Sequence, residues 1–207
     1  MLKLITILPA LLLAASAHAD QQPRKLDNFV GINVKGPINM QVDVGKAQTV
    51  TISGEKAFID RVQTVVDGGV LRITYDENGP KNIKGESKIL ITVPALTSFR
   101  VQGAGQADLN GVAGERIDIS FEGAGALHAN GKVKLLRLKA QGVGEVNTKD
   151  LKTERADVNF NGMGDVAVHA SDTLNLVVRG MGNLSYYGHP KTVNKSVGGI
   201  GNVSAKD

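Results

Sequence analysis

One column of mostly polar residues holds the side chains best suited to chemistry in this sequence. Each member stands three positions after the first glycine of a Gly-x-Gly triplet. The polar members are Gln106, Glu145, Asp165, Asn183 and Asn202. If neighbouring triplets stack one strand spacing apart, about 4.8 Å, Glu145 and Asp165 can share a proton or bind a cation. The spacing also approaches the separation of about 5 Å between the two carboxylates of a retaining glycosidase.

A second interpretation of this column is a solvated polar ladder at a corner of the fold, and it is the one we favour. Stacked amide side chains are ordinary in β structures, so they need no ligand to explain them. The histidines lack the close spacing of a metal pair, and the chain has no cysteine to serve as a thiol nucleophile. We therefore expect no catalytic residue, no metal and no cofactor.

The glycine triplets themselves recur at regular intervals along the second half of the chain. Successive triplets begin 20, 19, 20, 18 and 19 residues apart. The glycines are Gly103, Gly105, Gly123, Gly125, Gly142, Gly144, Gly162, Gly164, Gly180, Gly182, Gly199 and Gly201. Such a period is typical of an architecture built from stacked units, and here it predicts a structural bend at each triplet.

The residues that flank each triplet alternate between apolar and polar, which is the period of a β-strand and not of a helix. Positions two, four and six before the first glycine are almost all apolar, as are positions four and six after it. The middle residue of each triplet is apolar too. We expect all six of these columns to point into one core, with the intervening columns facing solvent.

A chain of about 19 residues extends to about 60 Å, enough to travel once round a small cross-section and return one strand spacing further along. The sequence therefore predicts an all-β, single-stranded parallel β-helix with a Gly-x-Gly bend every 18–20 residues. Right-handed coiling is expected because parallel crossovers are overwhelmingly right-handed.

The first half of the mature chain also alternates, but without triplets. We expect irregular β coils over residues 27–96, forming one continuous domain with the regular repeats of residues 97–205; a separate small β domain is the alternative. Asp67 and Gly68 predict a hairpin between two strand-like segments. Residues 55–60 have room for one helical turn.

The first nineteen residues have the form of a secretory signal peptide. A lysine near the start precedes an apolar stretch, and Ala17-His18-Ala19 provides a cleavage site after Ala19. Residues 20–26 are expected to be a disordered segment at the start of the mature protein. The sequence thus predicts export to the periplasm, the cell surface or the medium, and no transmembrane segment in the mature chain.

The composition argues against nucleic acid as a partner and identifies no other partner. The 207 residues carry a net charge of +4, but the charges are interspersed, aromatic residues make up 4% and tryptophan is absent. A protein that stacks nucleobases needs exposed rings among basic residues, so nucleic acid is not an expected partner.

The motifs together resemble one family of bacterial exported proteins, the putative autotransporter adhesins with a head GIN domain. The resemblance covers residues 27–204, nearly all of the mature chain. It rests on residues 29–36 (FVGINVKG), 65–73 (VVDGGVLRI), 91–96 (ITVPAL) and 187–190 (YGHP). It implies a parallel β-helix in the envelope or at the cell surface, and it supplies no catalytic residues.

Two classes of function follow. The first, which we favour, is a non-catalytic adhesion or binding module of the bacterial cell envelope, with glycans, matrix or envelope proteins as candidate partners. The alternative is an exported polysaccharide-cleaving enzyme of the pectate-lyase type, which also uses a β-helix. Fold analogy alone supports the enzyme, and coils of 18–20 residues leave no long insertions to build a cleft. The sequence does not distinguish adhesion from a purely structural role, and it does not indicate an oligomeric state.

Overall fold

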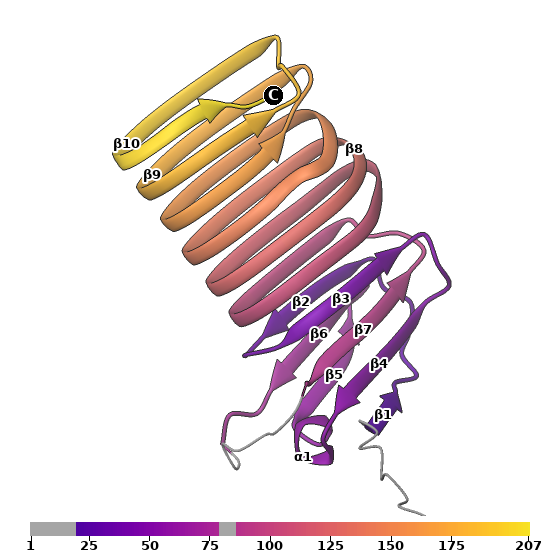
Figure 1. The fold of residues 1–207 in the computed structure, drawn as a ribbon. Coiled ribbons are helices and arrows are strands. Elements are labelled where there is room, and N and C mark those ends of the chain that lie inside the picture. The colour runs from indigo at the N-terminus through magenta and orange to yellow at the C-terminus, as the bar shows by residue number, and fades with distance from the viewer. Residues whose placement is uncertain (1–19, 79–85) are drawn as a thin grey trace, which may run out of the picture.

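The computed structural model describes residues 20–78 and 86–207, and these residues are almost entirely β-strand (Figure 1). The expected signal peptide lies outside the described residues. No helix in the described part of the chain has the length and apolar character needed to cross a membrane. The elements are β1 (Asp20–Pro23), β2 (Gly31–Lys35), β3 (Asn39–Val44), β4 (Thr49–Gly54), α1 (Lys56–Ile59), β5 (Val62–Asp67), β6 (Val70–Tyr75), β7 (Lys88–Val93), β8 (Ser98–His169), β9 (Thr173–Tyr187) and β10 (Thr192–Ala205).

The strands form one mixed sheet, which corrects the expected fold class. Its order is β1-β4-β7-β3-β8-β2-β6-β5, with β9 joined to β8 and β10 joined to β9. The pairs β1–β4, β4–β7 and β5–β6 are antiparallel, whereas the other pairs between elements are parallel. The prediction of a single-stranded parallel β-helix is therefore wrong: the sheet is mixed and curls in the manner of a half-barrel. The internal repeat does not define the domain either, because the antiparallel strands lie outside it.

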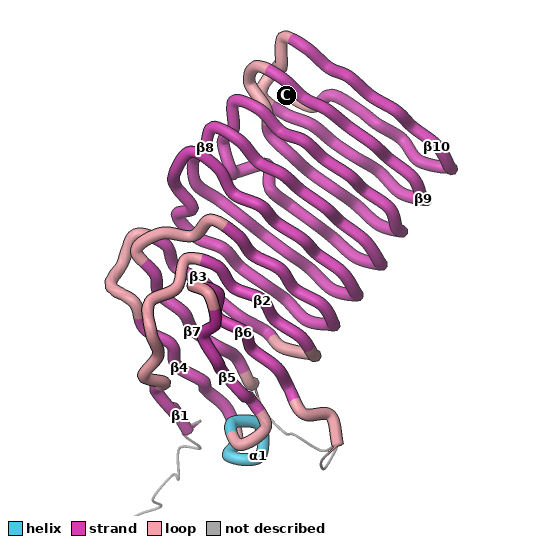
Figure 2. Tube along the Cα trace, turned by 180° about the vertical axis from the view of Figure 1, so that it is seen from behind, coloured by secondary structure: helices cyan, strands magenta, loops and turns pink. Residues whose placement is uncertain are grey.

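The C-terminal part of this sheet is one chain that winds back beside itself, and we call each passage a coil (Figure 2). Strand β8 runs through 72 residues. Its last part pairs in parallel with β9, so that Met163 lies beside Met181, and β10 pairs in parallel with β9, so that Ile200 lies beside Met181. The alternation of the sequence therefore continues from one coil to the next in register.

The N-terminal strands join these coils out of sequence order. Strands β2 and β3 pair in parallel with the first coil of β8, which places Val34 beside Val101 and Val42 beside Leu109. On their other side, β2 pairs with β6 and β3 pairs with β7. Strands β2 and β3 thus lie between β6 and β7 on one side and the first coil of β8 on the other.

The core lies inside the coils, where five of the six expected columns are buried. Ile119, Phe121, Val158 and Phe160 are each at most 5% exposed and belong to one continuous apolar cluster. Burying each such ring or branched chain stabilises the fold by about 2 kcal/mol. The columns are exposed at the outermost strand, where Val197 on β10 is 46% exposed.

The sixth expected column, the middle residues of the triplets, is not in the core. Val143, Met163, Met181 and Ile200 are 49%, 45%, 50% and 81% exposed. The alternation of strand side chains passes through the triplet without interruption, so the two glycines take the inward positions and the residue between them faces outward. The prediction that these side chains turn inward is wrong because it broke this alternation.

At the triplet glycines an added side chain would meet the backbone of the neighbouring coil. A Cβ atom placed on Gly164, whose φ is +136°, would lie 1.9 Å from the carbonyl oxygen of Gly144 on the preceding coil. The same contact would arise between Gly182 and Gly164. Glycine therefore fits these two bends because any side chain would overlap the backbone of the neighbouring coil.

The N-terminal end contains the local features that the sequence predicts. Strands β5 and β6 form an antiparallel hairpin in which Asp67 lies opposite Val70, as expected from the turn residues, and α1 provides the expected helical turn. Residues 20–26 were expected to be disordered, but β1 pairs with β4 through Gln21 and Ser53. Strand β1 is too short and too polar to be recognised by alternation.

Candidate functional site

Four of the five polar ladder residues lie together, on the outer surface of the last coils. Glu145, Asp165, Asn183 and Asn202 line one small pocket of about 320 Å³. Strand pairing places Asn183 between Asp165 and Asn202. The side-chain amide of Asn183 donates a hydrogen bond to Asp165 Oδ1 over 2.9 Å. The late ladder is thus a row of outward side chains, two of which, Asn183 and Asp165, are linked by a hydrogen bond.

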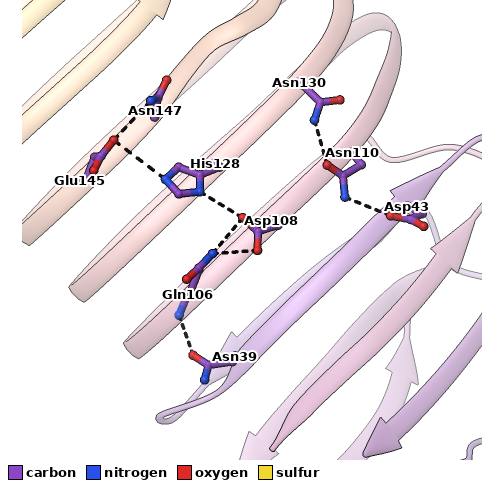
Figure 3. Close-up of polar contacts among 9 residues, drawn as sticks. All are labelled: Asn39, Asp43, Gln106, Asp108, Asn110, His128, Asn130, Glu145 and Asn147. Carbon is purple, nitrogen blue, oxygen red and sulfur yellow. Dashed lines mark hydrogen bonds and ion pairs between the residues drawn. The ribbon is translucent and has the colours of Figure 1, made fainter. Parts of the chain in front are cut away.

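Gln106 does not join this pocket. Its side-chain amide donates hydrogen bonds to both carboxylate oxygens of Asp108, at 3.2 and 3.0 Å, and its backbone N–H donates to Asn39 Oδ1 at 2.9 Å (Figure 3). Ala126, the apolar member of the column, occupies the coil between Gln106 and Glu145. The ladder is therefore divided into an early part that contacts β3 and a late part around the pocket.

His128 connects these two parts through a neighbouring column that sequence reasoning did not select. Its Nδ1 lies 3.1 Å from Asp108 Oδ1, and its Nε2 lies 3.9 Å from Glu145 Oε1 (Figure 3). Asp108 and His128 both stand five residues after the first glycine of a triplet, so the repeat spacing alone could have predicted that they lie in one column. Among the described residues no group of three or more His, Cys, Asp or Glu side chains has the arrangement of a metal site.

The two carboxylates of the ladder have separate partners. Glu145 accepts a hydrogen bond from the amide of Asn147 at 3.3 Å and faces His128, whereas Asp165 is held by Asn183. The side chain of Glu145 is 53% exposed. Carboxylates that are solvated and held by separate amides favour a solvated polar ladder over an acid–base pair.

A further hydrogen-bonded row joins β3 to the first coils. Asn130 donates to Asn110, and Asn110 donates to Asp43 Oδ1 at 3.1 Å (Figure 3). Asp43 also accepts hydrogen bonds from Lys46 at 2.8 Å and from Gln41 at 3.0 Å. The hydrogen bond from Lys46, followed by those from Gln41 and Asn110, lowers the pKa of Asp43 to about 2. This row fixes the N-terminal strands to the coils.

A long groove lies on the other side of the triplets, and the sequence analysis did not identify it. Its volume is about 930 Å³, roughly three times that of the ladder pocket. It crosses every C-terminal coil and reaches β2 and β6. Its lining residues are Ile32, Asn33, Val70, Ser98, Phe99, Arg100, Asp118, Ile119, Ser120, Arg137, Leu138, Lys139, Asp157, Val158, Asn159, Asn175, Leu176, Val177, Asn194, Lys195 and Ser196.

The construction of the groove follows from the strand alternation. Phe99, Ile119, Leu138 and Val158 are buried, so they present backbone to the groove and form its floor. Residues three and five positions before each triplet project on either side of that floor and form the walls. The sequence places these wall residues outside correctly, but their alternation does not show that the surface they share is concave.

Comparison with known proteins identifies the family. Residues 28–190 match the family described as "Putative auto-transporter adhesin, head GIN domain", and the chain belongs to that family. A search of curated proteins gives no match.

Two solved structures share the architecture. A crystal structure titled a putative adhesin from Bacteroides fragilis superimposes with a TM-score of 0.74 at 22% identity, covering 92% of this chain and 98% of that one. Another putative adhesin, from Parabacteroides merdae, gives a TM-score of 0.52 at 15% identity, covering 93% and 98%. At these identities the likeness establishes the fold alone.

Proposed function

We propose that this protein is an exported, non-catalytic adhesion module of the bacterial cell envelope that holds its partner in the long groove. The observation that carries this proposal is the groove itself. It is continuous across the C-terminal coils, and its floor is the backbone of a hydrogen-bonded sheet. Such a surface is preorganised, so binding an extended partner costs little ordering of the protein.

The family description and the titles of the two structural neighbours support the class of function. All three refer to adhesins, and none refers to an enzyme. The ladder does not suggest catalysis, because its carboxylates are exposed and are held by amides. Glycans, matrix components and envelope proteins are the partners that we propose to test.

An array of glycans, matrix proteins and envelope proteins, probed with residues 20–207, tests the proposal. We expect retention of at least one partner. Asn159→Trp, which places a ring in the groove, should weaken that binding about tenfold, equivalent to 1.4 kcal/mol. Asn183→Trp places the same ring on the ladder and serves as the matched control, with a change of no more than about twofold.

Two results would contradict this assignment of the site: no retention of any partner, or retention that Asn159→Trp leaves unchanged. Export is tested separately by fractionating cells that express the full chain. We expect the protein outside the cytoplasm, with Asp20 as its first residue. Uncleaved protein in the cytoplasm would contradict export.

A further inference from the structure

The charged side chains of the long groove are predominantly cationic. Arg100, Arg137, Lys139 and Lys195 line it, against two carboxylates, Asp118 and Asp157. Arg100 and Lys139 both stand three residues before a triplet and lie two coils apart, which corresponds to about 10 Å. Arg137 and Lys139 lie on the same coil, on opposite walls of the groove. The cationic groups are thus distributed along the groove and across it.

Both carboxylates in the groove are already neutralised by the protein. Asp118 forms an ion pair with Arg116, whose Nε lies 2.7 Å from Asp118 Oδ1. Asp157 accepts hydrogen bonds from Asn175 at 2.6 Å and from Arg155 at 3.0 Å. Burial raises the pKa of Asp157, but these hydrogen bonds and the charges of Arg155 and Arg137 outweigh it, so the pKa is lowered. Each carboxylate is thus paired with an arginine outside the groove lining, and the four cations of the lining outnumber the two carboxylates.

The cations in the groove have fewer partners. Lys139 lies 3.4 Å from Glu122, and Glu122 also accepts a hydrogen bond from Gln102 at 2.9 Å. Within the described part of the chain, Arg100 and Arg137 form no ion pair within 4 Å. A concave surface lined by one sign of charge concentrates the field and attracts the opposite charge.

The uncharged polar side chains of the groove are amides and hydroxyls, including Asn33, Ser98, Ser120 and Asn194. They can exchange hydrogen bonds with the hydroxyl groups of a sugar. The one aromatic residue in the lining, Phe99, is 1% exposed. A single-stranded nucleic acid is bound largely by stacking on exposed rings, and this groove offers none. The lining therefore favours a polyanion rich in hydroxyl groups.

We propose that the long groove binds an extended acidic polysaccharide, whose carboxylate or sulfate groups contact Arg100, Arg137 and Lys139. This inference rests on the proposed function, since it assigns a ligand class to the same groove. Guanidinium groups suit the role because their planar array of donors matches the paired oxygens of both anions. The ladder on the other side of the triplets carries carboxylates and should repel such a chain.

The test measures binding of residues 20–207 to alginate, which carries carboxylates, and to dextran sulfate, with unmodified dextran and polydeoxythymidylate as comparisons. We expect at least one of the two acidic polysaccharides to bind, dextran not to bind, and binding to weaken as NaCl rises from about 50 to about 200 mM, because salt screens exposed charges. Alginate and dextran sulfate together distinguish the two anionic groups.

The double variant Arg100→Gln with Arg137→Gln should weaken polysaccharide binding about tenfold or more. The matched control, Lys132→Gln with Lys149→Gln, removes two exposed lysines that do not line the groove and should change binding by no more than about twofold. Thermal unfolding of each variant separates loss of binding from loss of the fold. Arg137→Lys, which keeps the charge, should restore part of the affinity.

Three outcomes would overturn the inference. They are equal loss of binding in the groove variant and its control, binding of polydeoxythymidylate as tight as that of the polysaccharide, and binding of neither acidic polysaccharide. If a neutral glycan or a protein binds instead and Asn159→Trp blocks it, the acidic ligand is excluded while the groove keeps its proposed function. If Asn159→Trp blocks nothing, the proposed function fails as well.

Discussion

The two ends of the sheet differ in how their edge strands are paired and covered. At the N-terminal end, β5 covers the edge of β6 in antiparallel fashion, β4 covers β7, and β1 covers β4. The side chains of Phe58 and Ile59 on α1 close the core there. At the other end, β10 pairs with β9 and with no other strand of the described residues (Figure 1). Apolar side chains on β10, such as Val197 and Ile200, are exposed.

This difference shows that the N-terminal end is closed by strands of opposite direction. A parallel strand needs a long return path, whereas an antiparallel neighbour needs a tight turn such as the one after Asp67. Only the β5–β6 pair is joined by such a turn, because other elements separate β1 from β4 and β4 from β7 along the chain. The N-terminal end should therefore contribute more stability per residue than the last coil, and the following variants test that contrast.

Phe58→Ala should give the largest loss. The ring is 4% exposed and lies 5.6 Å from the ring of Tyr75, so its removal leaves a cavity at the closed end. We expect a loss of about 3–5 kcal/mol in the free energy of unfolding, measured by urea titration. Val197→Ala at the open end is the comparison and should cost less than about 1 kcal/mol. Equal losses would mean that both ends are closed.

Gly164→Ala should cost about 3 kcal/mol, because the added Cβ would overlap the carbonyl oxygen of Gly144 in the neighbouring coil. Gly68→Ala in the β5–β6 turn is the matched control. Its φ is +56°, but nothing lies within 4 Å of the added atom. It should lose only the conformational cost of about 1–2 kcal/mol. A smaller loss at Gly164 than at Gly68 would contradict the close packing of the coils.

Asp43→Asn should cost about 1–2 kcal/mol at pH 7, because the lowered pKa of Asp43 reflects hydrogen bonds that favour its charged form. In the wild type this contribution is complete above the ordinary pKa of 3.8 and is lost as the pH falls towards about 2. Unfolding measured between pH 2 and pH 5 should therefore show a weaker pH dependence in the variant. An unchanged pH profile would remove Asp43 from the connection between β3 and the coils.

Asp165→Asn should have the smallest effect, within about 0.5 kcal/mol, because the side chain is exposed and an amide can still accept the hydrogen bond from Asn183. Adding Ca²⁺, Mg²⁺ or Zn²⁺ to the wild type should shift its melting temperature little. A rise of several degrees at micromolar metal, absent in both Asp165→Asn and Glu145→Gln, would instead indicate a cation site in the ladder.

The sequence predicts most of the local structure but less of the arrangement in space. Alternation places Phe121 and Phe160 in the core, and turn chemistry locates the β5–β6 hairpin, because both depend on near neighbours in the chain. The position of β2 and β3 between β6–β7 and the first coil cannot be predicted from near neighbours in the chain. It depends on pairings across 67 residues, as between Val34 and Val101, for which one sequence carries no local signal.

The candidate site shows the same limit. Spacing brings Asp165, Asn183 and Asn202 into one row, but it cannot show that Glu145 faces His128 or that Asp165 is held by Asn183, because these contacts depend on side-chain rotamers. The groove was missed for a different reason. Alternation places its wall residues outside, but it does not show that they enclose a concave surface.

The outer edge of β10, to which no strand of the described residues pairs, makes the length of the molecule adjustable. Its fourteen residues repeat the register of β9 with a shift of 19 residues, so they offer a further coil the same template that β9 offered to β10. An inserted copy of one such segment should lengthen the molecule by about 4.8 Å without rearranging the coils beneath it. The long groove would extend by the same step, so its reach along a polymer could be changed independently of its chemistry.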